Sequence, residues 1–380
     1  MKVGIDFTPA LYDRGVSRYT TNLVRSLLEK PAVELTLYGS SLRSHQKLTT
    51  RAKKVVNAAK VANQPQLHFQ QYPPKLHRLI WRFGLNSIQS QLPHLEVFHS
   101  WDWLQPPDKK LPLVSTIHDL AMLKYPDVAH PELLKAHQRS WRILKERQAE
   151  IIAVSQATKK DIMNFLDIPS FRIHVVPEAL PREIRDTNEA MTEQQTEAIK
   201  TRLKLDRPYV LFVGTREPRK NLLRLIEAWQ PLNDQLDLLI VGAKGWDQTG
   251  DVRYHQPNLR FLGKVTDQEL NVLYAEAEVF AFPSLDEGFG LPILEAFYHG
   301  TPVVTSTANA LVEVAGNAAQ LVNPESPEDI RGGIQTVLNE TADQQRVRLQ
   351  RMIIRLHMFS WHQTAEQTIE VYRKAIEHHE

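Results

Sequence analysis

Residues 284–304 read SLDEGFGLPILEAFYHGTPVV, and this stretch decides how the second half of the chain folds. The apolar residues at 279–282 directly before it predict a buried strand. Pro292 suits the first turn of a helix, and Gly300 suits the position just after its end. The stretch therefore predicts a strand, a loop that contains glycine, and then a helix.

Two carboxylates flank the glycines of this stretch, with Glu287 in the predicted loop and Glu295 one turn inside the predicted helix. Gly288 and Gly290 let the backbone come close to a ligand, and their amides lie near a helix amino terminus, where phosphate groups bind. Carboxylates accept hydrogen bonds from hydroxyl groups. The combination indicates a ligand with hydroxyls and phosphate, such as a sugar nucleotide. Two carboxylates that only complement the helix dipole are the structural alternative.

Strand and helix patterns alternate on both sides of this stretch. Apolar runs separated by segments with helical spacing favour parallel sheets covered by helices on both faces. The pattern runs twice, which predicts an α/β chain of two doubly wound, Rossmann-like domains with a ligand cleft between them. The predicted strands are 2–7, 34–39, 96–100, 111–119, 150–155 and 172–178 in the first half, and 209–214, 236–242, 259–263, 279–284, 302–306 and 318–323 in the second.

The seam between the two halves lies in a polar and charged stretch without a strand pattern. We predict an amino-terminal domain at 1–185, a linker with a connecting helix at 186–207, a second domain at 208–360, and an amphipathic carboxyl-terminal helix at 361–380. The length of 380 residues agrees with two domains.

Three cations follow the first strand of the second half, in the sequence GTREPRKN at 214–221. Arg216, Arg219 and Lys220 precede a predicted helix, and cations at a helix amino terminus are unfavourable to the helix dipole. A bound anion such as a diphosphate explains their placement. The alternative is an exposed basic loop with Glu217 as its partner.

Two further positions follow strands of the first half. Gly15 joins the first strand to the first helix, where a glycine permits a close backbone approach or simply makes a turn; the GxGxxG string of nicotinamide sites is absent. His118, with Asp119 after it, lies at the carboxyl end of a strand. There a histidine can bind a sugar hydroxyl or transfer a proton, or it can be purely structural.

Composition excludes several classes of protein. The chain has no cysteine, so disulfides, thiolate metal sites and cysteine nucleophiles are excluded. No run approaches the length of a membrane span, and the amino terminus resembles a first strand more than a signal peptide, so we expect a cytoplasmic protein.

The charge is uneven although the net charge is only +2. Residues 35–95 contain no Asp or Glu, and nine Lys and Arg residues give them a charge of +9. Four apolar residues lie among these cations: Leu79, Ile80, Trp81 and Phe83. This combination favours binding to an anionic surface, that of the inner face of the membrane. A merely solvated basic face is the alternative. Nucleic acid is not expected, because no binding motif accompanies the charge.

Taken together, these motifs resemble the retaining glycosyltransferases of family four, also called glycosyltransferase group 1, with the GT-B fold. The resemblance covers nearly the whole chain. Its most specific part is EGFGLPILE, in which seven residues separate two glutamates, followed by AFYHGTPVVTS. The segments GTREPRKNL, LLIVGAKGW and FLGKVTDQELNVLYAEAEVF match the family in order and spacing.

The resemblance implies roles for the residues at the matching positions. Glu287 is expected at the donor sugar, Glu295 at the ribose hydroxyls, and Lys220 at the diphosphate of the leaving group. The family often has Arg where this chain has Thr215, so Arg216 or Arg219 has to supply that charge. The remaining expected contacts are the amides of Phe289, Gly290 and Leu291 with the sugar and diphosphate, Gly15 near the phosphates, and His118 beside the transferred sugar.

The resemblance also implies the chemistry. It implies transfer with retention at the anomeric carbon, in which the leaving diphosphate helps to deprotonate the acceptor. The chain contains no Asp-x-Asp sequence, so we expect neither a metal nor another cofactor. The expected donor is GDP-mannose or a UDP-sugar, and the expected acceptor is a glycan or a lipid-linked molecule. The alternatives are a sugar-nucleotide epimerase or phosphorylase with the same fold, and a sugar-nucleotide-binding protein without catalytic activity.

Overall fold

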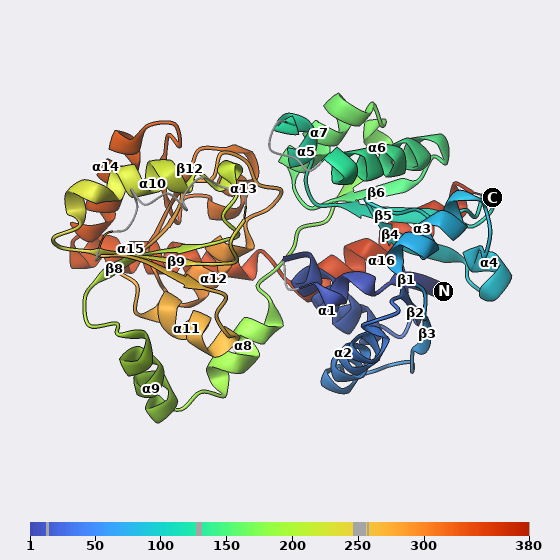
Figure 1. Ribbon diagram of the computed structural model, residues 1–380, viewed down its shortest axis with the longest axis horizontal. Helices are drawn as coiled ribbons and strands as arrows, with labels where there is room; N and C mark the ends of the chain where they lie inside the picture. Colours follow the sequence, from blue (N-terminus) through green and yellow to red (C-terminus); the bar gives the residue numbers. More distant parts are fainter. Residues whose placement is uncertain (13–14, 127–130, 246–255, 257, 380) are drawn as a thin grey trace. The chain divides into compact units, whose positions relative to one another are not determined.

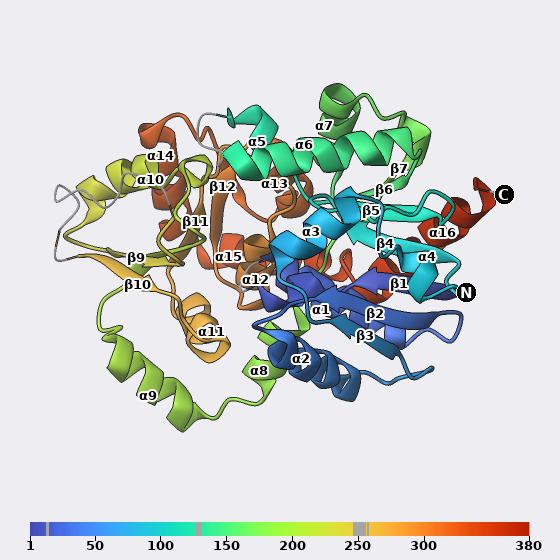
Figure 2. The same cartoon turned by 45° about the vertical axis from the view of Figure 1, so that its right-hand side comes forward.

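The structure, a computed structural model, describes residues 1–12, 15–126, 131–245, 256 and 258–379. It forms two compact units, of which one contains Met1–Glu178 and Trp361–Glu380 and the other contains Ala179–Ser360. Each unit is a parallel sheet with helices on its faces (Figure 1 and Figure 2). Trp246, which belongs to the segment LLIVGAKGW, and Glu380, the last residue of the predicted carboxyl-terminal helix, lie outside the described residues.

The sheet of the first unit has seven strands in the order β3-β2-β1-β4-β5-β6-β7, all of them parallel. The strands are β1 (Lys2–Asp6), β2 (Glu34–Ser40), β3 (Gln66–Gln70), β4 (Val97–Trp101), β5 (Leu113–Ile117), β6 (Glu150–Ala153) and β7 (Ile173–Val175). The sequence predicted six of these. It missed the edge strand β3, QLHFQ, because only two of its five residues are apolar and none of them is buried.

The strand order of this sheet reverses between the neighbouring strands β1 and β4: β2 and β3 lie on the side of β1, and β5, β6 and β7 lie on the side of β4. Ile5 of β1 aligns with Leu37 of β2 on one side and with His99 of β4 on the other. At such a reversal the loops after two neighbouring strands lead away to opposite faces of the sheet, and ligands bind outside the carboxyl ends of those strands.

Helices cover both faces of the first sheet. They are α1 (Gly15–Leu28), α2 (His45–Ala58), α3 (Pro74–Arg82), α4 (Ile88–Gln91), α5 (Ala121–Lys124), α6 (Pro131–Glu146), α7 (Gln156–Leu166) and α16 (Trp361–Glu377), with short 3-10 turns at Thr8–Leu11 and Ser170–Arg172. The carboxyl-terminal helix α16 follows the second sheet in sequence but packs on the first. Its Tyr372 is buried, and the hydroxyl of Tyr372 lies 2.7 Å from Nδ1 of His99 in β4.

The second sheet has six parallel strands in the order β10-β9-β8-β11-β12-β13, and the sequence predicted all of them. They are β8 (Tyr209–Val213), β9 (Asp237–Val241), β10 (Leu259–Gly263), β11 (Val279–Phe282), β12 (Val303–Ser306) and β13 (Gln320–Val322). The order reverses between β8 and β11. These two strands pair in parallel, with Phe280 aligned to Leu211, so the loops that follow them begin side by side.

The helices of the second unit begin before its sheet. They are α8 (Arg182–Glu189), α9 (Glu193–Leu203), α10 (Leu222–Trp229), α11 (Asp267–Ala275), α12 (Leu291–Tyr298), α13 (Asn309–Ala315), α14 (Pro327–Leu338) and α15 (Ala342–His357), with 3-10 turns at Pro218–Lys220 and Gln230–Leu232. The predicted linker at 186–207 thus contains the end of α8 and all of α9. A capping box of Thr192 and Gln195 begins α9, and Asn271 of α11 donates a hydrogen bond to the carbonyl of Ile184 in α8.

Within the described part of the chain, no helix combines the length and the hydrophobicity that a membrane span requires.

Candidate active site

The loops that follow β8 and β11 lie at the carboxyl ends of the two strands where the order of the second sheet reverses. The first loop carries the basic motif and runs into the 3-10 turn Pro218–Lys220 before α10. The second carries Glu287 and runs into α12. Because β8 and β11 are paired neighbours, residues separated widely in sequence meet here.

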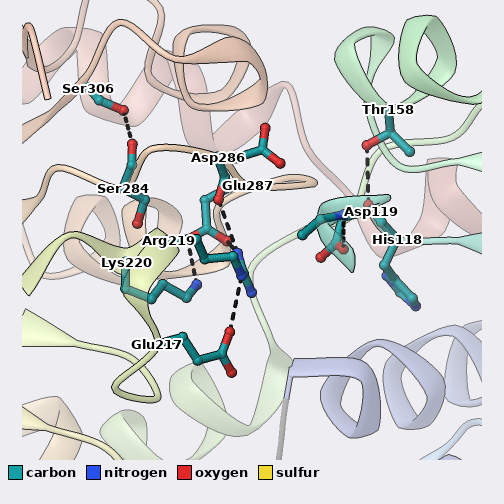
Figure 3. A network of polar contacts seen from close by, with 11 residues as sticks. His118, Asp119, Thr158, Glu217, Arg219, Lys220, Ser284, Asp286, Glu287 and Ser306 are labelled. Atoms are coloured by element: carbon teal, nitrogen blue, oxygen red, sulfur yellow. Dashed lines mark hydrogen bonds and ion pairs between the residues drawn. The ribbon is translucent and has the colours of Figure 1, made fainter. Parts of the chain in front are cut away.

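A network of ion pairs connects the two loops (Figure 3). Nζ of Lys220 lies 2.5 Å from Oε1 of Glu287, and Nη1 of Arg219 lies 2.8 Å from Oε2 of the same carboxylate. Nε of Arg219 lies 3.1 Å from Oε2 of Glu217. The exposed fractions of the side chains are 9% for Glu287, 12% for Lys220 and 18% for Arg219. The carboxylate of the glycine-bearing stretch and two of the three predicted cations therefore form one largely buried cluster.

This environment lowers the pKa values of both Glu287 and Lys220, but for different reasons. Burial alone would raise the pKa of Glu287, but Arg219 and Lys220 outweigh it and lower that pKa to about 2. Burial lowers the pKa of Lys220, and the charge of Arg219 acts in the same direction, against the opposing effect of Glu287. Glu287 is therefore a carboxylate at neutral pH and is the group that keeps two neighbouring cations together.

The backbone around Asn221 fixes the geometry of the two loops. Asn221 has a φ of 61°, and its Nδ2 donates to the carbonyls of Pro283 and Pro324 at 2.9 and 2.6 Å. The amide of Leu285 donates to the carbonyl of Arg219 at 2.8 Å. Asparagine is one of the few residues that adopt this left-handed conformation readily. Asn221 is thus a structural residue of the site, which the sequence analysis did not single out.

Arg216 points elsewhere. Its guanidinium lies over the ring of Phe261 in β10, 5.0 Å from the ring centroid. The loop after β9 approaches it closely, because a Cβ at Gly245 would lie 1.9 Å from the carbonyl oxygen of Arg216. Of the two arginines that the sequence left open for the missing charge at Thr215, the structure brings Arg219 to Glu287 and Lys220.

The amino terminus of α12 is built on Gly290, which has a φ of 119°. A Cβ there would also lie 2.8 Å from Cδ2 of Leu311, so a side chain would be both strained and crowded. The flanking side chains of Phe289 and Leu291 are 6% and 9% exposed. These two side chains are therefore packed inside the protein. The contacts expected for Phe289 and Leu291 with the ligand involve their backbone amides only.

Glu295 lies in α12 and is 4% exposed. Oε2 of Glu295 accepts a hydrogen bond from the hydroxyl of Tyr274 in α11 at 3.0 Å. A buried carboxylate needs such donors because burial without them is costly. The side chain is held in place by this contact, in the helix that follows the loop carrying Glu287.

In the first unit, His118 follows β5 directly. Its Nδ1 lies 3.1 Å from Oε1 of Glu178, which follows β7. The rings of Tyr19 and Trp101 pack around the imidazole, with centroids at 4.7 and 6.1 Å. Nε2 of His118 is buried and has no hydrogen-bond partner among the residues that the structure describes. The imidazole is therefore held through Nδ1, while Nε2 is buried and makes no hydrogen bond to the described residues.

Glu178 also determines how His118 titrates. Burial by itself would lower the pKa of His118, but the hydrogen bond and the charge of Glu178 outweigh it, and Asp102 and Asp119 add to the same effect, so the pKa is raised. Figure 3 shows Thr158, whose hydroxyl donates to the carbonyl of His118 at 3.2 Å. The sequence analysis did not single out Glu178; its place at the end of the predicted strand 172–178 was the available signal.

Gly15 is the first residue of α1 and is exposed. A Cβ there would meet no described atom within 4 Å, so the packing of the described residues does not by itself require glycine. The nearby strand β1 ends at Asp6, whose pKa burial raises to about 6 although the amide of Thr8 donates to its carboxylate. Asp6 is a second titratable group of the first unit that the sequence analysis did not predict.

Among the described residues, no group of three or more His, Asp or Glu side chains is arranged to hold a metal ion. The clusters that the structure does form pair cations with carboxylates. In the second unit they offer positive charge to an anion and a carboxylate to hydroxyl groups, within a few ångströms of each other.

Comparison with known proteins places this geometry in a family. A model of the glycosyl transferases group 1 matches residues 193–353, and a model of glycosyltransferase family 4 matches residues 14–183. HepE of Anabaena, solved in complex with UDP and glucose, has a TM-score of 0.72 over 98% of this chain and 100% of its own, at 16% identity. That similarity shows the shared GT-B fold.

Two bacterial relatives have names that describe an activity. The O-antigen chain mannosyltransferase B of Escherichia coli is 29% identical over 272 residues, which are 68% of this chain and 70% of that protein. The serotype-specific mannosyltransferase WbdA of Escherichia coli is 28% identical over 249 residues, which are 61% of this chain and 29% of that protein. Because the two models together match residues 14–183 and 193–353, which is most of both units, the chain belongs to the group 1 glycosyltransferases of family four.

Proposed function

We propose that this glycosyltransferase moves a hexose from a nucleotide-diphosphate sugar to a glycan or lipid-linked acceptor, with retention at the anomeric carbon. The observation that carries the proposal is the cluster of Lys220, Arg219 and Glu287 at the strand reversal of the second sheet. Two cations suit a diphosphate, and the carboxylate suits the hydroxyls of the sugar attached to it.

The proposed roles follow the positions of the side chains. Lys220 and Arg219 stabilise the negative charge that develops on the leaving diphosphate, which is an electrostatic form of catalysis. Glu287 contacts the donor sugar, and Glu295 accepts hydrogen bonds from the ribose hydroxyls. In the first unit, His118 contacts the transferred sugar through Nε2.

The remaining proposed contacts come from the backbone. The amides of Phe289, Gly290 and Leu291 at the start of α12 hold the sugar and the diphosphate. Gly15 at the start of α1 lies close to the donor phosphates; its surroundings are open, since a Cβ there would meet no described atom within 4 Å.

A mannosyl donor, GDP-mannose, is the first choice for the substrate. It is supported by the names of the two Escherichia coli relatives, which are both mannosyltransferases. A UDP-sugar is the second choice, because the structurally similar HepE is described in complex with UDP and glucose. The O-antigen relative also supports a polysaccharide acceptor.

We also propose that transfer needs no metal ion. The chain has no Asp-x-Asp sequence, and Lys220 with Arg219 can provide the positive charge that a divalent cation would otherwise supply.

A panel of sugar nucleotides tests the donor. GDP-mannose, UDP-glucose and UDP-N-acetylglucosamine are compared for their ability to raise the melting temperature, since a ligand at about 100 times its Kd stabilises a protein by about 2.7 kcal/mol. Proton NMR of the transferred sugar then reports its anomeric configuration. Release of a changed sugar without any acceptor identifies an epimerase instead, and binding without turnover of any donor identifies a protein that only binds sugar nucleotides.

The basic surface of the first unit supports a peripheral attachment to an anionic membrane, on the cytoplasmic side. The structure changes which apolar residues can contribute. Trp81 is 6% exposed and Ile80 packs against the same core, so both belong to the buried side of α3. The sequence analysis counted Ile80 and Trp81 among the residues that favour a membrane surface, and this part of the prediction is wrong, because His77, Ile80 and Trp81 share the helical face that packs on the core.

The outward side of α3 is nevertheless apolar. Leu76, Leu79 and Phe83, spaced three and four residues apart, are 42%, 46% and 69% exposed. The cations Arg78 and Arg82 are exposed beside them. A short apolar face flanked by arginines is typical of a helix that lies in the plane of a membrane surface, with the arginines at the anionic headgroups.

A further inference from the structure

One carboxylate neutralises both of the cations that we assign to the diphosphate. Each oxygen of Glu287 contacts a different cation, Oε1 with Nζ of Lys220 at 2.5 Å and Oε2 with Nη1 of Arg219 at 2.8 Å. Glu287 therefore occupies, within the protein itself, the electrostatic position that a bridging phosphate would take.

The four charged groups that these ion pairs join balance one another without any ligand. Glu217 and Glu287 contribute two negative charges, and Arg219 and Lys220 contribute two positive charges. A nucleoside diphosphate brings additional negative charge into a site where Glu287 is only 9% exposed, so solvent screens the repulsion between the phosphate and the carboxylate poorly. The diphosphate and the carboxylate of Glu287 therefore compete for contacts with the same two cations.

We propose that Glu287 is an internal counter-ion that the diphosphate of the donor displaces. When the donor binds, Lys220 and Arg219 exchange the carboxylate of Glu287 for phosphate oxygens, and the released carboxylate accepts hydrogen bonds from the sugar hydroxyls. The inference rests on the proposed function, because it assumes that the ligand is a nucleotide-diphosphate sugar.

The surrounding contacts suit such an exchange. Nε of Arg219 stays with Glu217 at 3.1 Å, and Nη1 also donates to the carbonyl of Asp286 at 3.0 Å. These two contacts hold the guanidinium in place while Glu287 leaves. Nζ of Lys220 lies 5.1 Å from the centroid of the Phe282 ring, which gives the ammonium a second favourable contact on the side of the strand. The cations therefore stay where they are, and the carboxylate is the member that moves.

Glu287→Gln tests the exchange, because it keeps the shape of the side chain and removes the competing charge. Binding of GDP and of UDP, which carry the diphosphate without a sugar, is measured by isothermal titration calorimetry. We expect Glu287→Gln to bind the preferred nucleotide at least tenfold more tightly than the wild type, while it turns over the donor sugar more slowly. Its melting temperature should be lower than that of the wild type without nucleotide and should rise further when nucleotide is added.

Glu217→Gln is the matched control. It removes one negative charge from the same cluster, but from the carboxylate that positions Arg219. We expect no gain in nucleotide affinity from it. An equal gain in both variants would show a general charge effect and would overturn the exchange. Glu287→Met, which is also uncharged and similar in size, provides a second variant if Glu287→Gln does not fold.

A double variant shows whether the competition acts through Lys220. In a Lys220→Met background, the gain in nucleotide affinity from Glu287→Gln should fall to about threefold or less, since one of the two contested cations is absent. An undiminished gain would contradict the assignment. A wild-type protein that binds no nucleotide at all would refute the proposed function, whereas a wild type that binds nucleotide while Glu287→Gln binds it equally or more weakly would refute only the exchange.

Discussion

Nδ1 of His118 lies 3.1 Å from Oε1 of Glu178, and this pair joins the carboxyl ends of β5 and β7 in the first sheet. Sixty positions separate the two residues in the chain. The contact commits one ring nitrogen of the histidine to the carboxylate and leaves Nε2 for another partner. Glu178 is therefore a positioning residue for His118, and we expect its replacement to change the pKa of the imidazole.

Replacement of Glu178 by Gln should lower the pKa of His118 below the ordinary value of histidine. Burial lowers that pKa, and the carboxylate is the main group that opposes burial. Proton NMR titration of the His118 ring measures the change, with Glu146→Gln on the exposed side of α6 as the control that should leave it unaltered. An unchanged titration in Glu178→Gln would remove Glu178 from this role.

The same pair predicts a dependence of stability on pH. The raised pKa of His118 means that the folded protein binds its proton more tightly than the unfolded chain does. The stabilisation is complete below the pKa of the unfolded histidine and is lost as the pH rises through the higher pKa of the folded state. Denaturant unfolding of the wild type and of Glu178→Gln over this range should show the loss in the wild type and not in the variant.

Replacement of Lys220 by Ala should reduce turnover by a factor on the order of 10² to 10³, the effect of losing one preorganised group that stabilises developing charge. The protein should remain folded, because the substitution also relieves the burial of a charged group. Steady-state kinetics with the best donor measures the loss, and Lys374→Ala on the exposed face of α16 is the control. A folded variant with unchanged turnover would exclude Lys220 from the diphosphate site.

Transfer should continue in an excess of EDTA. The absence of Asp-x-Asp and the presence of two cations beside Glu287 are the reasons. Initial rates are compared with EDTA, with added magnesium and with added manganese. Loss of activity with EDTA and its recovery with either metal would show that our account of charge stabilisation is wrong.

The apolar face of α3 should anchor the protein to vesicles that contain anionic lipid. Leu79→Glu combined with Phe83→Glu should abolish sedimentation with such vesicles at low salt. The control is Phe171→Glu, because Phe171 is 67% exposed in the same unit, close to the 69% of Phe83, but lies outside α3. Arg78→Glu combined with Arg82→Glu should weaken binding and reduce its dependence on salt. A wild type that stays in the supernatant at low salt would refute the membrane proposal and leave the donor proposal intact.

Gly242 should tolerate no side chain. It has a φ of 141°, and a Cβ there would lie 1.9 Å from the carbonyl oxygen of Gly214, in the loop that begins the cationic motif. Gly242→Ala should cost at least about 2 kcal/mol of unfolding free energy, or roughly 4–8 °C in melting temperature. Gly332→Ala in α14 has open space within 4 Å, so it should stabilise the protein by about 0.5–1 kcal/mol. Equal melting temperatures for the two variants would contradict this contrast.

Periodicity in the sequence was sufficient for the buried strands. In the second sheet, β8 (YVLFV) and β11 (VFAF) are continuous apolar runs and β9 (DLLIV) is one apart from its first residue, because a strand in a covered parallel sheet is buried on both faces. The edge strand β3 was missed since its QLHFQ sequence is only partly buried and lacks that run. The carboxyl-terminal helix α16 was predicted as a helix, but its attachment to the first sheet depends on contacts such as Tyr372 with His99, which no local pattern reveals.

Local patterns also did not predict whether an individual side chain faces the core or the surface. Four apolar residues among the cations, Leu79, Ile80, Trp81 and Phe83, were predicted to favour a membrane surface. The core takes up Trp81 and part of Ile80, and only Leu79 and Phe83 are exposed. The carboxylate Glu178 is far from His118 in sequence, so its role became visible only when the strands were aligned.

The family, the two α/β halves and the positions of Lys220 and Glu287 in loops that follow strands could all be predicted from the sequence, because glycine, proline and apolar spacing are local properties. The tertiary structure alone decided that these two residues meet and that Arg219, not Arg216, joins them. The reason is the order of the second sheet: β8 and β11 are neighbours in space although they lie far apart in the chain, and the residues of the loops that follow them, Lys220 and Glu287, are 67 positions apart. Local patterns carry no information about which strands become neighbours, and burial and charge pairing select the partners only once the sheet has formed.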